Sequence, residues 1–168
     1  ILISVFDINK PNIPILTTYS YAYNWQQGSR LSWLNDTNFI YNDFDFIKKK
    51  YISNVYSLKS NRIIKSFSLP NYAVHLNKFF LSLNTERLTL LQNDYGYYNT
   101  PPMTLKKSKV LCNDGITYVD IQSCKSRLLF SLEDCYKLLS KYINTIEGHV
   151  INHLLISDSG EKIIFLYR

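Results

Sequence analysis

The chain has 168 residues, of which 46% are hydrophobic, 15% aromatic and 19% charged, and its formal net charge at pH 7 is +6. This composition excludes a disordered chain, because such chains contain few aromatic residues and too little apolar surface to form a core. The 14 tyrosines and 9 phenylalanines favour β-structure, since aromatic and β-branched residues are enriched in half-buried strands.

The positive charge is concentrated in two short segments, 48–50 and 106–109. Lysine runs of this kind are typical of solvated loops that keep the edges of a sheet soluble. No nucleic-acid recognition motif accompanies them, so the charge alone does not favour a nucleic-acid partner. No apolar run reaches the about 20 residues that cross a bilayer, and the sequence therefore predicts no membrane span.

The cysteine content bears on the cellular compartment. Three cysteines without CxxC spacing predict free thiols in place of a disulfide or a zinc site. Free thiols favour the cytoplasm, whereas a periplasmic location would require that a signal peptide has been removed. Strand-like runs at both ends of the chain, 1–8 and 163–167, predict that the chain is a fragment of a longer protein.

Strand-like patterns begin in the first part of the chain. In segment 19–25 aromatic residues occupy every second position, which places the four rings on one face of an extended chain. Between Arg30 and Pro70, four short segments of strand-like composition are separated by turn residues, and this order predicts a four-stranded antiparallel meander. Pro70 ends the last of these strands because proline cannot donate a ladder hydrogen bond.

The pattern then recurs along the chain. It begins again near Tyr72, resumes after an insertion at Ile116, and begins a third time at Ile151. Trp33 and Val74 occupy equivalent places in the first two repeats and are about 40 residues apart, an interval typical of β-propeller blades. The predicted fold class is all-β, a partial β-propeller of about two to three four-stranded antiparallel blades.

One inserted helix interrupts the β-pattern, and we expect it near 132–143. Ser131 resembles an N-cap, and Glu133 and Asp134 place negative charge in the first turn, where the helix dipole favours it. Apolar residues then follow at helical spacing. The whole chain is predicted to be a single propeller fragment, divided into the end of one blade at 1–23, a complete blade at 24–70, a blade with a long insertion at 71–130, the inserted helix and its loop at 131–148, and the start of a further blade at 149–168.

The densest group of polar side chains follows the alternating aromatic segment. Its candidate ligand-binding residues are Trp25, Gln26, Gln27, Arg30, Asn42 and Asp43. Glutamine and arginine offer several donors to hydroxyls and carboxylates, Arg30 can bind a carboxylate through two parallel hydrogen bonds, and Trp25 can stack on a sugar ring. The alternative, given equal weight, is that these residues lock the blade, with Arg30 paired to Asp43.

A second group of candidates lies in the insertion that ends at Pro101 and Pro102. Arg87, Tyr95 and Tyr97 belong to this long excursion between two strands. A long ordered loop in a compact repeat is more often functional than not, and its tyrosines suit a carbohydrate or a partner protein. Alternatively, they cover a neighbouring blade.

His149 and His153 are the remaining candidates. On a helix they would share a face, but the chain lacks the glutamate of a HExxH metal site. On a strand they would stand about 13 Å apart, too far for one ion to bind both directly. The sequence therefore predicts no cofactor, and a divalent metal bound by these histidines is the alternative. In the structural interpretation, the two histidines are polar residues whose hydrogen bonds are satisfied between blades.

Several segments resemble bacterial β-propellers related to the TolB-like and oligogalacturonate-lyase-like groups. These segments are 24–33, 39–43, 72–74 together with 81–84, and 151–160. The Ser-Asp-Ser-Gly turn at 157–160 is similar to the turn of TolB-like blades, in which a proline often stands at the position of Ser159. The resemblance implies a closed ring of about six or seven blades and an association with glycan biosynthesis.

These observations lead to one functional hypothesis and two alternatives. The first is a non-catalytic binding module for a glycan or a partner protein, linked to bacterial polysaccharide metabolism. An alternative is a metal-dependent polysaccharide lyase or hydrolase, because oligogalacturonate lyases hold a divalent metal with several histidines. The other is a structural scaffold without a ligand. No nucleophile elbow, phosphate-binding glycine loop or close carboxylate pair is present, so no catalytic residue is assigned.

Overall fold

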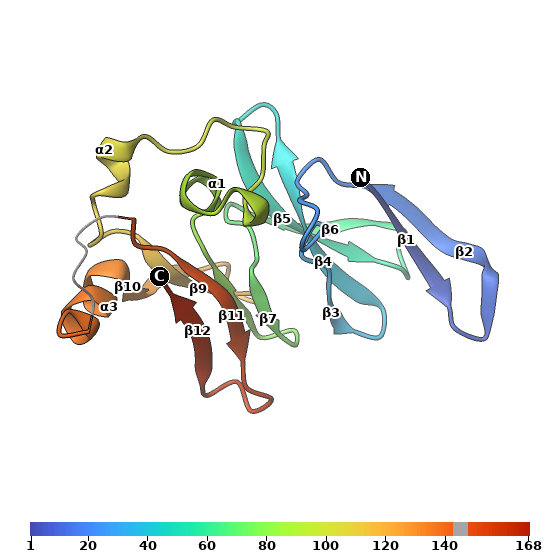
Figure 1. Ribbon diagram of the computed structural model, residues 1–168. Coiled ribbons are helices and arrows are strands. Elements are labelled where there is room, and N and C mark those ends of the chain that lie inside the picture. The colour runs from blue at the N-terminus through green and yellow to red at the C-terminus, as the bar shows by residue number, and fades with distance from the viewer. Residues whose placement is uncertain (143–147) are drawn as a thin grey trace.

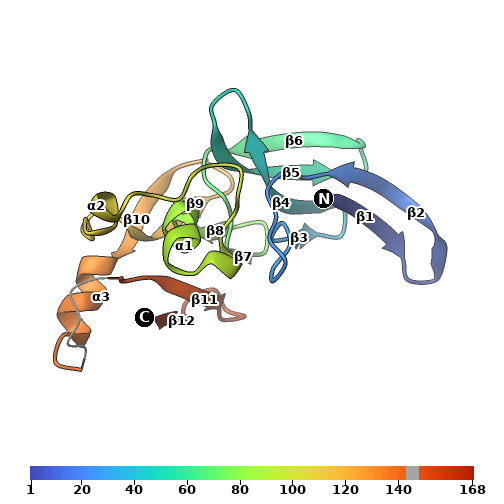
Figure 2. The same cartoon turned by 45° about the horizontal axis from the view of Figure 1, so that its top comes forward.

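The computed structural model describes residues 1–142 and 148–168, and most of its regular structure is β-strand. The strands among these residues form four antiparallel sheets, two of four strands and two of two strands. In Figures 1 and 2 the sheets follow one another in chain order, from the N-terminal hairpin on the right to the C-terminal hairpin on the lower left. The prediction of an all-β chain is confirmed at this level.

The first sheet is a hairpin of two strands, β1 (Leu2–Asp7) and β2 (Lys10–Tyr19). The amino group of Ile1 donates a hydrogen bond to the carbonyl of Ser20 at 2.6 Å, so the pairing extends beyond the strands. The face that carries Ile3 is buried against the second sheet. The opposite face is exposed.

The second sheet is the predicted four-stranded meander. Its strands, in spatial order, are β3 (Ser32–Asn35), β4 (Asn38–Asp45), β5 (Lys50–Ser57) and β6 (Arg62–Phe67). Asn35 fixes the turn between the first two strands, because its carboxamide oxygen accepts hydrogen bonds from the backbone N–H groups of Thr37 and Asn38.

The last two sheets repeat the same antiparallel order. The third contains β7 (Ala73–His75), β8 (Phe79–Ser82), β9 (Gly115–Asp120) and β10 (Ser126–Ser131). The fourth contains β11 (Ile151–Ile156) and β12 (Ile163–Tyr167). The predicted insertion separates the second and third strands of the third sheet.

The insertion contains helices, so the prediction of a single helix is wrong. They are α1 (Thr85–Leu91), the 3-10 turn η1 (Asn93–Tyr95) and α2 (Leu105–Ser108). Asn84 caps α1, because its side-chain oxygen accepts hydrogen bonds from the backbone N–H groups of Glu86 and Arg87 at 3.1 and 3.2 Å. An asparagine before an acidic first turn is a helix-start signal, and here it lies two residues after the end of β8.

The predicted inserted helix forms but is shorter than expected. In α3 (Leu132–Leu139) a capping box joins Ser131 and Asp134, each of which accepts a hydrogen bond from the other's backbone N–H at 3.0 Å. The helix ends at Leu139, and the residues up to Tyr142 form turns. Tyr142 is 75% exposed, so burial does not stabilise a further turn. The predicted end, 143, lies outside the described residues.

The alternating aromatic segment extends past the end of β2. The aromatic side chains from Tyr19 to Trp25 are exposed, whereas Ser20, Ala22 and Asn24 between them are buried. The predicted alternation is therefore confirmed as a pattern of exposed aromatic and buried intervening side chains. Beyond Tyr19 the segment leaves the sheet, bends at Tyr21 and enters a turn at Trp25.

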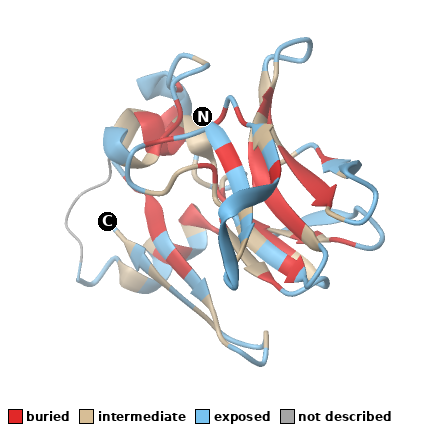
Figure 3. Cartoon of the chain, turned by 90° about the vertical axis from the view of Figure 1, so that its right-hand side faces the viewer, coloured by how far each residue is buried: buried red, intermediate tan, exposed pale blue. Residues whose placement is uncertain are grey.

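The second, third and fourth sheets meet along their first strands, and successive sheets pack face against face. β7 lies beside β3 on one side and beside β11 on the other (Figure 1). Apolar side chains fill the spaces between successive sheets, for example Phe67 against Phe80, whose ring centroids are 5.2 Å apart. In Figure 3 buried residues lie mainly along the strands, whereas most of the turns between strands are exposed.

Candidate functional site

An open pocket lies where the first strands of three sheets approach one another. Its volume is about 520 Å³, and it extends along β3, β7 and β11. Residues that line it include Gln27, Arg30, Asn71, Tyr72, Leu154 and Ile156. Two of the predicted ligand-binding residues, Gln27 and Arg30, therefore line the same pocket.

Arg30 is held over an aromatic ring at the edge of this pocket. Its guanidinium carbon lies 3.4 Å from the centroid of the Tyr72 ring, a cation–π contact. Its backbone has a positive φ of 54°, a conformation that non-glycine residues seldom adopt. Burial lowers the pKa of Arg30, while Tyr72 and Tyr97 oppose that shift. The group stays charged at neutral pH, because a guanidinium is not deprotonated in proteins.

Several polar atoms around Arg30 are unsatisfied. Nη2 of Arg30, Oε1 of Gln27 and Oγ of Ser29 are buried and make no hydrogen bond to the described residues. None of the ion pairs between described residues includes Arg30. An unsatisfied buried polar group costs about 1–3 kcal/mol, so the site is suited to a ligand that supplies oxygen acceptors for the guanidinium.

The predicted pairing of Arg30 with Asp43, which belonged to the structural alternative, is wrong. The carboxylate of Asp43 accepts hydrogen bonds from the backbone N–H of Tyr21 at 2.9 Å and of Phe44 at 2.8 Å. Its second oxygen accepts one from the side chain of Asn54 at 3.2 Å. Asp43 thus anchors the segment after β2 to β4, and it forms no ion pair with Arg30.

Trp25 and Gln26 lie at the tip of a small hairpin next to the pocket. Asn24 and Gly28 exchange two backbone hydrogen bonds at its base, and the side chain of Asn24 accepts a third from the N–H of Gln27 at 2.7 Å. The Trp25 side chain is 91% exposed. This tip presents an indole ring to solvent beside the Arg30 site.

Tyr95 and His153 join the same region through Tyr72. The backbone N–H of His153 donates a hydrogen bond to the Tyr72 hydroxyl at 2.9 Å, and the His153 ring contacts Tyr95 edge-on with centroids 5.1 Å apart. Asn24 donates a hydrogen bond to the Tyr95 carbonyl at 3.1 Å. Tyr72 thus contacts Arg30 and the backbone of His153, and Tyr95 joins this region through the His153 ring.

Asn42 and Tyr97 form a buried network behind the pocket. The Asn42 amide donates hydrogen bonds to the Tyr97 hydroxyl and to the Asn71 carbonyl, both at 2.8 Å. The Asn42 oxygen accepts one from the backbone N–H of Asn71 at 2.7 Å. Burial raises the pKa of Tyr97 to about 12. Asn42 thus fixes the segment directly before β7, which carries Asn71 and Tyr72.

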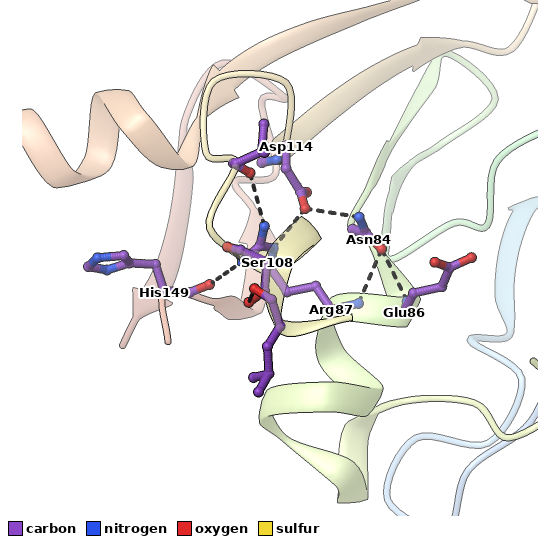
Figure 4. Close-up of polar contacts among 9 residues, drawn as sticks. Asn84, Glu86, Arg87, Ser108, Asp114 and His149 are labelled. Carbon is purple, nitrogen blue, oxygen red and sulfur yellow. Dashed lines mark hydrogen bonds and ion pairs between the residues drawn. The ribbon is translucent and has the colours of Figure 1, made fainter. Parts of the chain in front are cut away.

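Arg87 lies apart from the pocket and is fully engaged by the protein (Figure 4). Its Nε forms an ion pair with Asp114 at 2.7 Å, and its Nη atoms donate hydrogen bonds to the carbonyls of Ser108, Val110 and His149. The side chain is 2% exposed. This arrangement ties α1 to the loop before β9 and to the segment before β11.

The two candidate histidines have separate surroundings. His149 is buried, its Nδ1 lies 2.7 Å from the Tyr167 hydroxyl, and its ring stacks on the ring of the same tyrosine. His153 is exposed and contacts Tyr95 instead. Among the described residues no three histidine, cysteine or acidic side chains are grouped closely enough to hold a metal ion.

Sequence reasoning missed Tyr72 and Asn71 as members of the site. Both precede β7 directly, where the sequence indicates only the start of a strand. Their role depends on long-range contacts, because Tyr72 meets Arg30 and His153, and Asn71 meets Asn42. An aromatic residue at a strand entrance is too common to be a signal by itself.

A comparison of the chain with models of protein families, with curated proteins and with solved structures finds no match. The fold and the site define the class of protein. It consists of successive antiparallel sheets, with a pocket that contains Arg30 and Tyr72 between the first strands of three of them. None of the helices within the described residues is long and apolar enough to cross a membrane.

Proposed function

We propose that the chain is part of a β-propeller. Three features support this arrangement. The sheets are antiparallel and follow one another in chain order, the first strands of the last three lie side by side, and successive sheets pack face against face through apolar cores. Radial repetition of four-stranded sheets around a central channel is the architecture of propellers. The Arg30 pocket would then open toward that channel.

Within this fold, the chain acts as a non-catalytic binding module for a glycan that carries carboxylate groups. The observation behind this proposal is the Arg30 guanidinium, which lines an open pocket and has no acidic partner among the described residues. A carboxylate can accept two parallel hydrogen bonds from such a fork. A phosphate would also match the charge, but the neighbouring aromatic surfaces favour a sugar.

The surroundings of Arg30 supply the remaining contacts for a saccharide. Gln27 offers an amide for hydroxyl groups, and Leu154 and Ile156 form an apolar wall. Trp25, at the exposed tip of the 24–28 hairpin, presents a flat ring on which a pyranose can stack. The acidic glycan is thus recognised by one charge, a few polar groups and an aromatic face.

The test is a calorimetric titration with an oligouronate and with the neutral oligosaccharide of equal length and linkage. We expect saturable binding of the oligouronate that weakens as salt increases, because the contact is partly exposed. Arg30→Gln should weaken binding by roughly 10- to 100-fold, the effect of one charge-assisted hydrogen bond.

The matched control is Arg62→Gln, which removes an equal charge from an exposed position on β6. This variant should bind the oligouronate as the unmodified chain does. Equal binding of the neutral sugar, or equal losses in the two variants, would contradict the proposal. Ultraviolet absorbance from an unsaturated product, with or without manganese, would show that the module is an enzyme.

A further inference from the structure

A second pocket lies between the second and third sheets and shares no lining residue with the Arg30 pocket. Its volume is about 380 Å³. The walls come from the start of β5, the segment after β6, the end of β8 with the start of α1, and the loop before β9. All of these segments lie within 50–117, and the two sheets that enclose the pocket have four strands each.

The floor of this pocket is polar. Phe80 of β8 packs against Phe67 of the second sheet, with ring centroids 5.2 Å apart. Because side chains alternate along a strand, Ser82 points to the same side as Phe80. Ser82 is 2% exposed and lines the pocket, and its hydroxyl makes no hydrogen bond to the described residues. The hydroxyl of its cross-strand partner, Thr117, lines the pocket and is also without a partner among these residues. Such hydroxyls are available to a polar ligand.

A negative charge stands at the rim of the pocket. Glu86 lines it and is half-buried. The backbone N–H of Glu86 is bound by the helix cap, but its carboxylate makes no hydrogen bond or ion pair with the described residues. In Figure 4 this carboxylate extends away from the pair formed by Arg87 and Asp114. The charge of Glu86 is therefore available inside the pocket.

A positive charge lines the same pocket. Lys50 is half-buried, and its ammonium group makes no hydrogen bond or ion pair with the described residues, Glu86 included. Its cross-strand partner Asp45 is engaged within its own turn, where its carboxylate accepts hydrogen bonds from the backbone N–H groups of Ile47 at 3.0 Å and Lys48 at 2.9 Å. Two opposite charges thus line one pocket without neutralising each other.

The other carboxylate at the pocket is already saturated. One oxygen of Asp114 accepts hydrogen bonds from Arg87 at 2.7 Å and from the side chain of Asn84 at 2.9 Å, and the other accepts one from the backbone N–H of Gly115 at 2.8 Å. Glu86 is then the single free carboxylate among the described residues that line the pocket. Calcium and magnesium need several oxygen ligands, so this donor set fits an ammonium group better than a divalent metal.

We propose that this pocket binds a small zwitterion, a molecule with one ammonium and one carboxylate group, as in a free amino acid. The ammonium pairs with Glu86 and the carboxylate pairs with Lys50, while Ser82 offers a further hydrogen bond. Leu69 and Pro70 supply apolar surface for the body of the ligand. A ligand with a single charge would be attracted by one rim residue and repelled by the other. The inference rests on neither the propeller arrangement nor the Arg30 ligand.

The test is a calorimetric titration of the 168-residue chain with leucine and with two analogues of the same skeleton. Isoamylamine lacks the carboxylate of leucine, and isocaproate lacks its ammonium group. ε-Aminocaproate, whose charges stand at opposite ends of its chain, tests a wider spacing. We expect at least one of the two zwitterions to bind saturably, roughly 10-fold or more tighter than either singly charged analogue, and more weakly as salt increases.

The variants Lys50→Gln and Glu86→Gln assign each charge. Each should weaken binding of the zwitterion by roughly 10-fold, the effect of one charge-assisted hydrogen bond at a half-buried position. Lys50→Gln should not weaken binding of isoamylamine, because that ligand has no carboxylate to lose a partner. The matched controls are Lys59→Gln and Glu161→Gln, which remove equal charges at exposed positions and should leave binding unchanged. Circular dichroism checks that each variant is folded.

The inference is overturned if neither zwitterion binds, if the singly charged analogues bind as tightly, or if the control variants lose as much affinity as the pocket variants. A loss of zwitterion binding in Arg30→Gln would place the ligand in the other pocket and would overturn it too. The oligouronate titration is a separate measurement. A chain that binds the oligouronate but no zwitterion refutes only this inference, and the reverse result refutes only the glycan proposal.

Discussion

Arginine side chains in this protein have opposite surroundings. Arg87 is buried, paired with Asp114, and donates hydrogen bonds to three backbone carbonyls. Arg30 lies over Tyr72, and its Nη2 makes no hydrogen bond to the described residues. A saturated buried cation stabilises a fold, whereas an unsaturated one at a pocket is available to a ligand. Residue type alone does not distinguish these roles.

The first stability prediction concerns Arg87. Arg87→Met should lower the free energy of unfolding by about 3–5 kcal/mol, because it leaves the Asp114 carboxylate without its counter-charge and three carbonyls without donors. Urea denaturation followed by tryptophan fluorescence measures the change. Arg62→Met, at an exposed position, should change stability by less than about 0.5 kcal/mol. A loss of under about 1 kcal/mol in Arg87→Met would show that the network adds little.

At the level of elements, side-chain caps decide where the helices begin. Asn84 caps α1 two residues after the end of β8, and Ser131, the last residue of β10, caps α3. The strands before these helices are short. They end where the side chain of the capping residue, in place of a neighbouring strand, accepts hydrogen bonds from the next backbone N–H groups. Neither helix is long enough to be stable alone, so both depend on burial against the sheets.

The second stability prediction concerns the start of α3. Ser131→Ala should destabilise the protein by about 1 kcal/mol, because it removes the acceptor for the N–H of Asp134. Thermal unfolding by circular dichroism measures the effect. Ser140→Ala, at the other end of the helix and exposed, is the matched control and should leave the unfolding temperature unchanged. Equal shifts in both variants would mean that the cap does not contribute.

At the scale of the whole molecule, the buried Tyr97 and the half-buried Tyr167 link the sheets to the segments between them. Tyr97 joins the insertion to Asn42 on the second sheet, and Tyr167 joins β12 to His149. Burial raises the pKa of each to about 12, from an ordinary value of 10.0. The folded state therefore keeps protons that the unfolded state loses.

This difference predicts alkaline unfolding. Because the folded pKa lies above the unfolded one, the contribution of each tyrosine is complete below pH 10 and is lost as the pH rises from 10 to about 12. Urea midpoints should fall over this interval. Tyr97→Phe should show a shallower fall than the unmodified chain, whereas Tyr142→Phe, an exposed change, should not. Parallel curves for all three proteins would contradict the assignment.

The sequence by itself determined the strands and turns, because period-two alternation and turn residues act over a few neighbouring positions. The second sheet, the alternation of 19–25 and the N-cap of α3 were predictable for this reason. The tertiary structure alone decided that Asp43 binds backbone N–H groups and leaves Arg30 on Tyr72, and that Arg87 is buried. These outcomes depend on contacts between residues that are distant in the chain, which no local pattern encodes.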